Sequence, residues 1–332
     1  MSPLTPFETP EADEEKNVSH IIQVMRRKLE KDYAVGSTQR DAHPKHTALL
    51  QPTFTIEDKL PDALRVGVFA QPRSFEAWVR FSNASGTPQS DAIKDLRGCA
   101  IKLRDVPGPR IAESDEPTTQ DFLMVNIPTM PLGTVKLFHD AIWLATEWSI
   151  ALFAAKMLLS GKAHILKALQ AAKINPSSPA DIRYWSTTPY LFGLGQAAKY
   201  SLIPSSRTQA SLPATLSDHY LADALAQQLA RGDLSFDFML QRRTDAASMP
   251  IEDAGVEWPE GKAPFVKLAT LRIARQEFRT TARNELSEAL TFSPGHALME
   301  HRPLGAVNRA RMRIYKEQST FRQQRDQRRK AM

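Results

Sequence analysis

The sequence predicts an α+β protein built on a mainly antiparallel sheet or barrel, with helices inserted between its strands. Short β-type runs recur along the chain, separated by turns rich in Pro, Gly and Asp. Helical segments fall between some of these runs but do not alternate with them strictly, which disfavours a parallel β-α-β architecture. The composition, with 42% hydrophobic and 24% charged residues in 332, is that of a globular protein.

The first part of the chain is predicted to contain a tail, one helix and several strands. Residues 1–16 are acidic and Pro-rich, so we expect a disordered tail there and a single domain over residues 17–332. Helical spacing over Asn17–Asp32 places Ile21, Ile22, Met25 and Leu29 on one face. The β-type runs that follow are Leu49–Ile56, Ala77–Ser82, Gly98–Leu103 and Phe122–Ile127.

The second part begins with a helical insertion and ends with a long helix. The insertion spans about residues 133–172. A short helix over Asp218–Ala230 and a long Arg-rich helix over about Leu304–Lys330 are also predicted. The remaining β-type runs are Tyr190–Leu202, Leu234–Gln241 and Phe265–Ile273.

Several classes of protein are excluded or disfavoured by what the sequence lacks. Cys99 is the only cysteine, so one chain cannot hold a disulfide, a Cys-rich zinc site or an iron–sulfur cluster. The amino terminus has neither the basic nor the apolar region of a signal peptide, and we expect a cytoplasmic protein. No GxGxxG turn, P-loop or GxSxG motif is present, which disfavours nucleotide cofactors and the common serine hydrolase arrangement.

Two segments bear on membranes and nucleic acids. The apolar stretch Ala141–Leu159 carries Glu147 and Lys156, so we expect a core or surface-lying helix and not a transmembrane span; peripheral lipid contact remains an alternative. From Arg302 to Met332 there are ten Lys or Arg against two Asp or Glu. Because no aromatic platform or helix-turn-helix pattern accompanies this charge, we expect no nucleic-acid partner.

The segment Arg311-Met-Arg-Ile-Tyr315 could hold a metal. Arg311 and Tyr315 are spaced i, i+4 and share one face of a helix. A guanidinium and a ferric ion would both favour the phenolate form of the tyrosine, which is the proximal ligand of haem catalases. The alternative is an Arg–Tyr pair that decorates a helix surface.

The segment Arg40-Asp-Ala-His43-Pro-Lys45-His46 offers an acid/base. A histidine above a peroxide could take a proton from one oxygen and return it to the other as the O–O bond breaks. The alternative is a histidine on a surface loop, and His46 competes with His43 for the role.

Five motifs in one order resemble the haem catalase superfamily over about Arg40–Arg322. They are RDAHPK at residue 40, VRFSNASG at 79 with KDLRGCAIKL at 94, ARGDLSFDFMLQ at 230, EWPEGKAPFVKLATLRIAR at 257, and LTFSPGHALMEHRPLGAVNRARMRIY at 290. The resemblance implies a closed antiparallel β-barrel with inserted helices and a carboxy-terminal helix that ligates haem b through its iron. In that family the haem enzymes break down peroxides.

The resemblance also implies roles for individual residues. Tyr315 matches the tyrosine that ligates iron, and Arg311 the arginine that keeps it as phenolate. His43 matches the distal acid/base, and Ser82 the serine that orients it. Arginines matching those that grip the haem propionates are Arg40, Arg80 and Arg322. Arginine suits this task because its planar fork binds a carboxylate through two hydrogen bonds.

One departure from the family concerns the residue that positions hydrogen peroxide. Catalases have a distal asparagine before the Phe-rich strand, whereas this chain has Thr118 at the matching position, with Gln120 as a possible substitute. The expected function is therefore a peroxide-cleaving oxidoreductase, a catalase or peroxidase, that uses hydrogen peroxide or an organic hydroperoxide and an unidentified electron donor. The alternatives are an enzyme that converts lipid hydroperoxides, similar to catalase-related allene oxide synthases, and a haem-binding protein without turnover. A role in the response to oxidative stress and an oligomeric assembly are further expectations.

Overall fold

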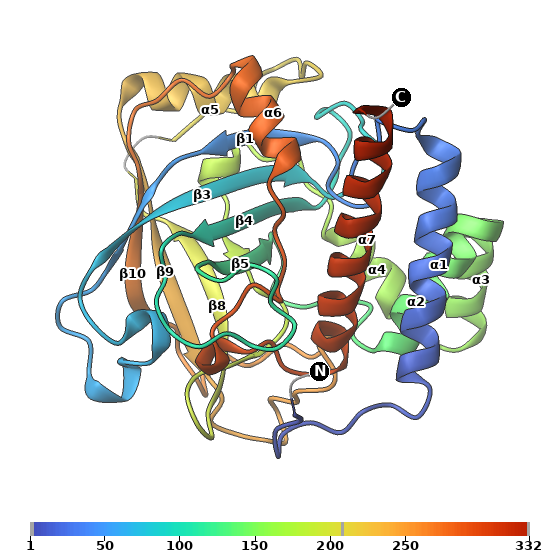
Figure 1. Ribbon diagram of the computed structural model, residues 1–332, viewed down its shortest axis with the longest axis horizontal. Helices are drawn as coiled ribbons and strands as arrows, with labels where there is room; N and C mark the ends of the chain where they lie inside the picture. Colours follow the sequence, from blue (N-terminus) through green and yellow to red (C-terminus); the bar gives the residue numbers. More distant parts are fainter. Residues whose placement is uncertain (1–2, 207–208, 331–332) are drawn as a thin grey trace.

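A computed structural model describes residues 3–206 and 209–330. It confirms the predicted α+β class (Figure 1). The helices are α1 (Glu14–Asp32), α2 (Val135–Trp143), the π-helical turn η3 (Leu144–Trp148), α3 (Ile150–Leu159), α4 (Ala163–Ala171), α5 (Tyr220–Arg231), α6 (Thr281–Ala289) and α7 (Ala306–Lys330). The strands are β1 (His46–Leu50), β2 (Thr53–Ile56), β3 (Ser74–Asn83), β4 (Arg97–Leu103), β5 (Gln120–Val125), β6 (Tyr184–Trp185), β7 (Tyr190–Leu191), β8 (Ala197–Pro204), β9 (Leu234–Arg242) and β10 (Val266–Ile273).

The strands close into an antiparallel barrel, as predicted. Around the ring the order is β3, β2, β10, β9, β8, β6, β5 and β4, and β4 pairs again with β3. β1 continues the edge of β3 beyond β2, and β7 pairs with β8. Closure shortens the free sheet edge along the ring, which limits pairing with other chains, although β5 meets β6 only through Val125 and Trp185 among the described residues.

Side chains fill the interior of the barrel. Along β9 the inward residues Phe236, Phe238 and Leu240 are fully buried. The ring of Phe238 lies 5.1 Å from that of Phe54 and 4.8 Å from that of Phe122, measured between centroids. Because aromatic packing occupies this space, a large ligand has to bind outside the barrel wall.

A layer of helices stands beside the barrel. In Figure 1, α7 runs next to β3, β4 and β5, and α1 lies on its far side with α2. Ile21 and Ile22 of α1 pack in one apolar cluster with Ala310 and Ile314 of α7. The long helix α7 confirms the one predicted over Leu304–Lys330 and lies against the barrel instead of projecting into solvent.

The described part of the amino-terminal segment, residues 3–16, contacts distant parts of the chain. Residues 14–16 form the first turn of α1, and Glu8 is buried. The Glu8 carboxylate binds Arg302 and Arg309, and accepts a hydrogen bond from the backbone N–H of Gly305 at 3.1 Å. A carboxylate of this acidic segment thus meets arginines that are distant in sequence.

Two strand predictions covered two strands each, and two elements were missed. The run Leu49–Ile56 is broken at Gln51 and Pro52, because proline lacks the N–H that continues a ladder. The run Tyr190–Leu202 is broken by a turn in which Gly193 and Gly195 have positive φ angles of 73° and 74°. Helix α6 and the two-residue strand β6 had not been predicted.

The apolar stretch Ala141–Leu159 forms separate helices. Trp143 ends α2, the π-helical turn follows, and the Ser149 side chain accepts a hydrogen bond from the backbone N–H of Leu152 at 3.2 Å to start α3. Within residues 3–206 and 209–330, no helix is both long and apolar enough to cross a bilayer.

His301 is a buried histidine of the barrel core, and it should make stability depend on pH. Its Nε2 accepts a hydrogen bond from the backbone N–H of Val68 at 3.0 Å, and burial lowers its pKa to about 3. Between pH 6.5 and about 3, His301 therefore binds a proton in the unfolded chain but stays neutral in the folded chain. Stability due to His301 is complete above pH 6.5 and falls by about 1.4 kcal/mol per pH unit below it.

Urea unfolding at several pH values tests this expectation. We expect the free energy of unfolding to decrease less steeply with acid in His301→Gln than in the unsubstituted protein. His219→Gln, which changes an exposed histidine, should keep the original slope. Equal slopes in all three proteins would contradict the assignment of a neutral His301.

Candidate active site

A cavity lies between the barrel wall and the helical layer. Its volume is about 260 Å³. Strands β3, β4 and β5, the loop before β1, and helices α1, α2 and α7 contribute its lining. Seven predicted site residues line it together: Arg40, His43, Arg80, Ser82, Arg311, Tyr315 and Arg322.

His43 reaches the cavity from a strained loop. Its φ is +56°, in the left-handed region that residues with side chains rarely adopt. A hydrogen bond joins its Nδ1 to the Oγ of Ser82 at 2.9 Å. Ser82 lies on β3 directly opposite Gly98 on β4. This backbone conformation brings Nδ1 of the imidazole to Ser82. The other ring nitrogen, Nε2, is then available to a ligand in the cavity.

His43 is held in its neutral form. Burial lowers its pKa to about 3, and the positive charges of Arg80, Arg311 and Arg40 add to the effect. Protonation would place a further positive charge among these guanidinium groups. Nearly all of the histidine is therefore neutral at pH 7, the state in which an imidazole can accept a proton.

Gly98 makes room for the imidazole. A Cβ at this position would lie 2.6 Å from Cε1 of His43, 2.7 Å from its Nδ1 and 2.9 Å from Oγ of Ser82. All three distances are too short for a real contact, so a larger residue has to displace the imidazole. The glycine of the KDLRG motif thus has a steric function, which the sequence alone did not reveal.

We expect Gly98→Ala to reduce peroxide cleavage by about 100-fold while haem still binds, because a displacement near 1 Å at a reacting group has this effect. Steady-state rates with hydrogen peroxide, together with haem titration, separate the two properties. Gly232→Ala is the matched control, since a Cβ there meets nothing within 4 Å. An unchanged rate in Gly98→Ala would contradict the steric role.

Tyr315 and Arg311 lie together on α7, as their spacing predicted. Tyr315 is half-buried against the apolar cluster that contains Leu123 and Phe292. The guanidinium carbon of Arg311 lies 5.5 Å from the centroid of the tyrosine ring. Asn308 Oδ1 and Thr188 Oγ1 accept hydrogen bonds from Arg311 at 3.2 and 3.3 Å and fix its position.

The charge of Arg311 is retained despite its burial. Burial alone would lower its pKa, but interactions with Tyr315 and Tyr190 outweigh this and raise it. The positive charge of Arg311 therefore lies beside the ring of Tyr315 in the cavity.

Arg40, Arg80 and Arg322 form a second group of positive charges. Burial lowers the pKa of Arg80 to about 10, and burial together with the charges of Arg80 and Arg322 lowers that of Arg40. Two carboxylates lie near them, those of Asp41 and Glu288. The three guanidinium groups outnumber these carboxylates, so an anionic ligand in the cavity would relieve their repulsion.

Helix α6 contributes residues that the sequence reasoning missed. Ser287 accepts hydrogen bonds from Arg80 Nε on its Oγ at 3.2 Å and from Arg40 on its backbone oxygen at 2.8 Å. Glu288 lies 3.1 Å from Arg40. Burial would raise the pKa of Glu288, but the hydrogen bond from His46 and the charges of Arg40 and Arg80 lower it to about 2. The available signal was the number of arginines predicted for one site, which calls for balancing acidic groups nearby.

Thr118 is placed elsewhere, contrary to expectation. It is exposed in the loop before β5 and does not line the cavity; its backbone oxygen accepts a hydrogen bond from the N–H of Val106 at 2.8 Å. Gln120 is buried, and its Oε1 accepts a hydrogen bond from the Leu298 N–H at 2.8 Å. On the β5 side the cavity is lined by the apolar residues Leu123, Met124 and Val125.

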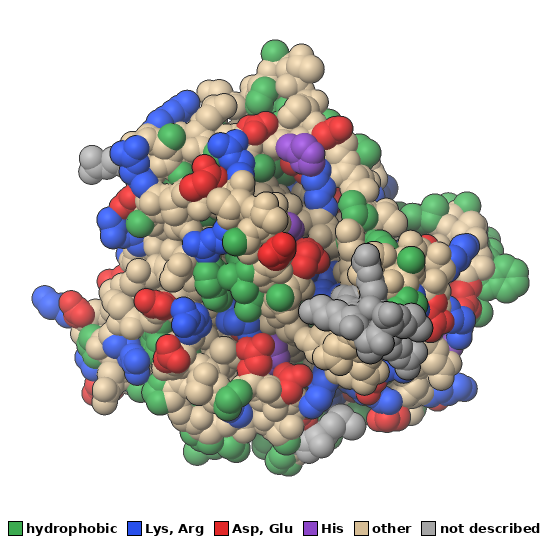
Figure 2. All heavy atoms as spheres, turned by 45° about the horizontal axis from the view of Figure 1, so that its top comes forward, with side chains coloured by type: hydrophobic (Ala, Val, Ile, Leu, Met, Phe, Trp, Pro, Cys, Tyr) green, Lys and Arg blue, Asp and Glu red, His purple; other side chains and the backbone are tan. Residues whose placement is uncertain are grey.

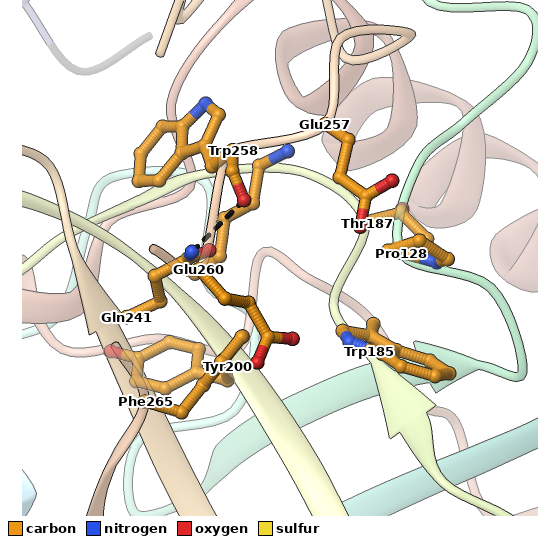
Figure 3. A pocket seen from close by; sticks show the side chains of 10 residues that line it. Pro128, Trp185, Thr187, Tyr200, Gln241, Glu257, Trp258, Glu260 and Phe265 are labelled. Carbon is orange, nitrogen blue, oxygen red and sulfur yellow. Dashed lines mark hydrogen bonds between the residues drawn. The ribbon is translucent and has the colours of Figure 1, made fainter. Parts of the chain in front are cut away.

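Figure 3 shows a smaller hollow. Thr187 lines both this hollow and the large cavity. Its volume is about 10 Å³, enough for roughly one water molecule. Gln241 donates hydrogen bonds to the backbone oxygens of Trp258 and Ala263, both at 3.0 Å. The Phe-x-x-Gln segment of β9 and the Trp-Pro segment are thereby joined, which is a structural function.

The residues of the large cavity fit haem. The phenol of Tyr315 and the imidazole of His43 line one cavity, and groups of these types act on the two sides of a haem iron. Arginines in the wall suit the two carboxylates that a haem carries. Apolar side chains that suit a porphyrin face complete the lining: Met25, Leu29, Leu123, Met124, Met130, Phe138, Phe292 and Ile314.

Comparisons with known proteins identify the fold. No protein-family model and no curated protein matches the sequence. Among solved structures, a fungal catalase superposes with a TM-score of 0.66 at 17% identity, over 83% of this chain and 58% of that one. Catalase A from Saccharomyces cerevisiae gives 0.66 at 16% identity, over 84% and 60%. A bacterial catalase gives 0.65 at 15% identity, over 97% and 63%.

The chain thus spans about three fifths of the length of these catalases. The matching parts include the barrel, whose closed antiparallel ring is that of the catalases. At identities of 15–17% such a likeness establishes architecture and leaves chemistry to the site residues. This protein has the catalase fold.

Proposed function

We propose that this protein is a haem b-dependent oxidoreductase that cleaves peroxides, as a catalase or a peroxidase. One observation carries the proposal: His43 and Tyr315 line the same cavity, with Arg311 beside the tyrosine and three further arginines in the wall. If Arg311 and Tyr315 only decorated a helix surface, or if His43 only lay on a surface loop, these residues would have no reason to line one cavity. The fold likeness to catalases supports the same reading.

Haem would be held by Tyr315 as the iron ligand and by Arg40, Arg80 and Arg322 at its carboxylates. When bound, haem would supply the two electrons that are consumed as the O–O bond of the peroxide breaks. Arg311 would place a positive charge beside the tyrosine oxygen that holds the iron. The arginines fix the orientation of the group, since a planar fork holds a carboxylate through two parallel hydrogen bonds.

His43 moves the proton. With its Nδ1–H donating to Ser82 Oγ, its Nε2 keeps a lone pair and takes the proton from the peroxide oxygen next to it. Nε2 then returns that proton to the oxygen that departs, so water or an alcohol leaves instead of an anion. Ser82 holds the ring in the orientation that both transfers require.

Conversion of lipid hydroperoxides is a second candidate, favoured by the apolar wall. Met25 and Leu29 of α1 and Phe138 of α2 form part of the lining. With Thr118 outside the cavity, the predicted equivalent of the distal asparagine is missing. An apolar wall of this kind suits a hydrocarbon chain better than it suits hydrogen peroxide.

The test uses purified protein loaded with haem. Its absorption spectrum is recorded before and after stoichiometric peroxide, and turnover is compared for hydrogen peroxide, cumene hydroperoxide and a fatty-acid hydroperoxide. A catalase or peroxidase turns over hydrogen peroxide fastest, whereas the second candidate prefers the fatty-acid hydroperoxide. A stable haem spectrum that no peroxide alters would overturn both candidates and indicate a haem carrier.

A further inference from the structure

Helix α3 has an outward face without polar side chains. At 100° per residue, the side turned away from Phe153 and Met157, its two buried residues, consists of Ala and Leu. Exposed side chains of this segment are 67% accessible at Trp148, 73% at Ile150, 60% at Leu158 and 91% at Leu159. Together with Leu152 these residues are called the α3 face. A surface helix normally directs polar residues outward.

The α3 face is a coherent patch at the edge of the molecule. In Figure 2 hydrophobic side chains gather along the right edge, where Figure 1 has α3. Both ends of α3 are held, because Ser149 caps its start and Phe153 and Met157 pack with Ile165 of α4. The apolar side chains are therefore presented on a fixed support.

The surroundings of the α3 face are positively charged. From Trp148 to Ala180 the sequence has no Asp or Glu but contains four lysines: Lys156, Lys162, Lys167 and Lys173. Lys156 pairs with Asp140 at 2.7 Å. Lys162 follows Leu159 by three residues, and both it and Lys167 are exposed; within the described residues neither has an ion pair.

Neighbouring acidic groups are neutralised. Glu147, which precedes Trp148, forms an ion pair with Arg27 of α1. The α3 face, with its exposed aliphatic groups and one tryptophan, thus lies next to the lysines Lys162 and Lys167. This combination is typical of segments that lie in the interface of an anionic bilayer, with lysines at the phosphates and apolar side chains among the acyl chains.

We propose that the α3 face binds the surface of anionic phospholipid membranes. A second copy of the chain fits less well, because a two-fold contact through this face would bring two sets of lysines together. The binding is peripheral and leaves α3 parallel to the bilayer. It is independent of peroxide chemistry, but it places next to a lipid surface the helical insertion whose Phe138 lines the large cavity.

Vesicle flotation with the haem-loaded protein tests the proposal. We expect the protein to float with phosphatidylcholine vesicles that contain phosphatidylglycerol and to remain behind with phosphatidylcholine alone. Lys162→Gln with Lys167→Gln should weaken binding about 25-fold, since each lysine near an anionic surface contributes about fivefold. Trp148→Ser with Leu159→Ser should weaken it by roughly tenfold or more.

The controls are exposed residues outside this face. Leu194→Ser, at a fully exposed leucine, and Lys59→Gln, at an exposed lysine, should bind vesicles as the unsubstituted protein does. A shift of tryptophan fluorescence to shorter wavelength on vesicle addition, absent in Trp148→Phe, would support insertion at this residue. Absence of flotation with either vesicle overturns the proposal. So does a dimer in sedimentation that Trp148→Ser dissociates.

Discussion

Tyr315→Phe is expected to lower the affinity for haem at least about tenfold and to change the spectrum of the haem that still binds. Even the loss of a residue that only supports a metal ligand weakens metal binding by 10–100-fold. Phenylalanine keeps the packing of the ring against Leu123 and Phe292 but removes the oxygen. The affinity follows from titration of the haem-free protein with haem, and the ligand from the absorption spectrum.

The matched control is Tyr220→Phe. Tyr220 lies on α5 and donates a hydrogen bond to the backbone oxygen of Pro176 at 3.0 Å, outside the large cavity. Its substitution should reduce stability by about 1 kcal/mol and leave the spectrum unchanged. If Tyr315→Phe bound haem with the affinity and spectrum of the unsubstituted protein, the proposed ligand would be wrong.

His43→Phe is expected to slow peroxide cleavage by roughly 10²–10⁴-fold while haem binding persists. This is the usual contribution of a positioned acid/base. Phenylalanine fills the space next to Gly98 but cannot carry a proton. Because the pKa of His43 is about 3, the rate in the unsubstituted protein should not depend on this group above about pH 5. It should fall as the pH approaches 3, where the imidazole becomes protonated.

Stopped-flow mixing of the haem-loaded variants with peroxide measures this rate across pH. Ser82→Ala should cause a smaller loss, since it removes only the group that orients the ring. His219→Gln, at an exposed histidine, should retain the full rate. An unaltered rate in His43→Phe would contradict the role of His43 and indicate that another residue of the cavity transfers the proton.

Local sequence patterns predicted most of the fold. Alternation and turn residues located β3, β4, β9 and β10, and helical spacing located α1, α5 and α7. Such patterns work because side-chain direction repeats every two residues in a strand and every 3.6 in a helix. They failed at β6, which has two residues, and at α6, whose Arg-Asn-Glu-Leu-Ser-Glu sequence has little apolar periodicity.

The position of Thr118 shows where sequence matching fails. The loop between β4 and β5 is irregular, so its residues have no repeating direction that counting could follow. A position matched by order in such a loop gives no information on where the side chain lies. His43, by contrast, lies between two positions that the fold fixes. Arg40 before it is bound to Ser287 of α6, and β1 begins after it at His46.

By itself the sequence determined the class of fold, most of its elements and the residue types available for chemistry. The tertiary structure decided that His43 and Tyr315, 272 positions apart, share one cavity, that Gly98 makes room for the imidazole, and that Glu288 balances part of the arginine charge. It also decided that α3 exposes its leucines. The reason is physical: local periodicity fixes which face of an element a side chain occupies, whereas burial and charge at that side chain depend on elements brought against it from distant parts of the chain.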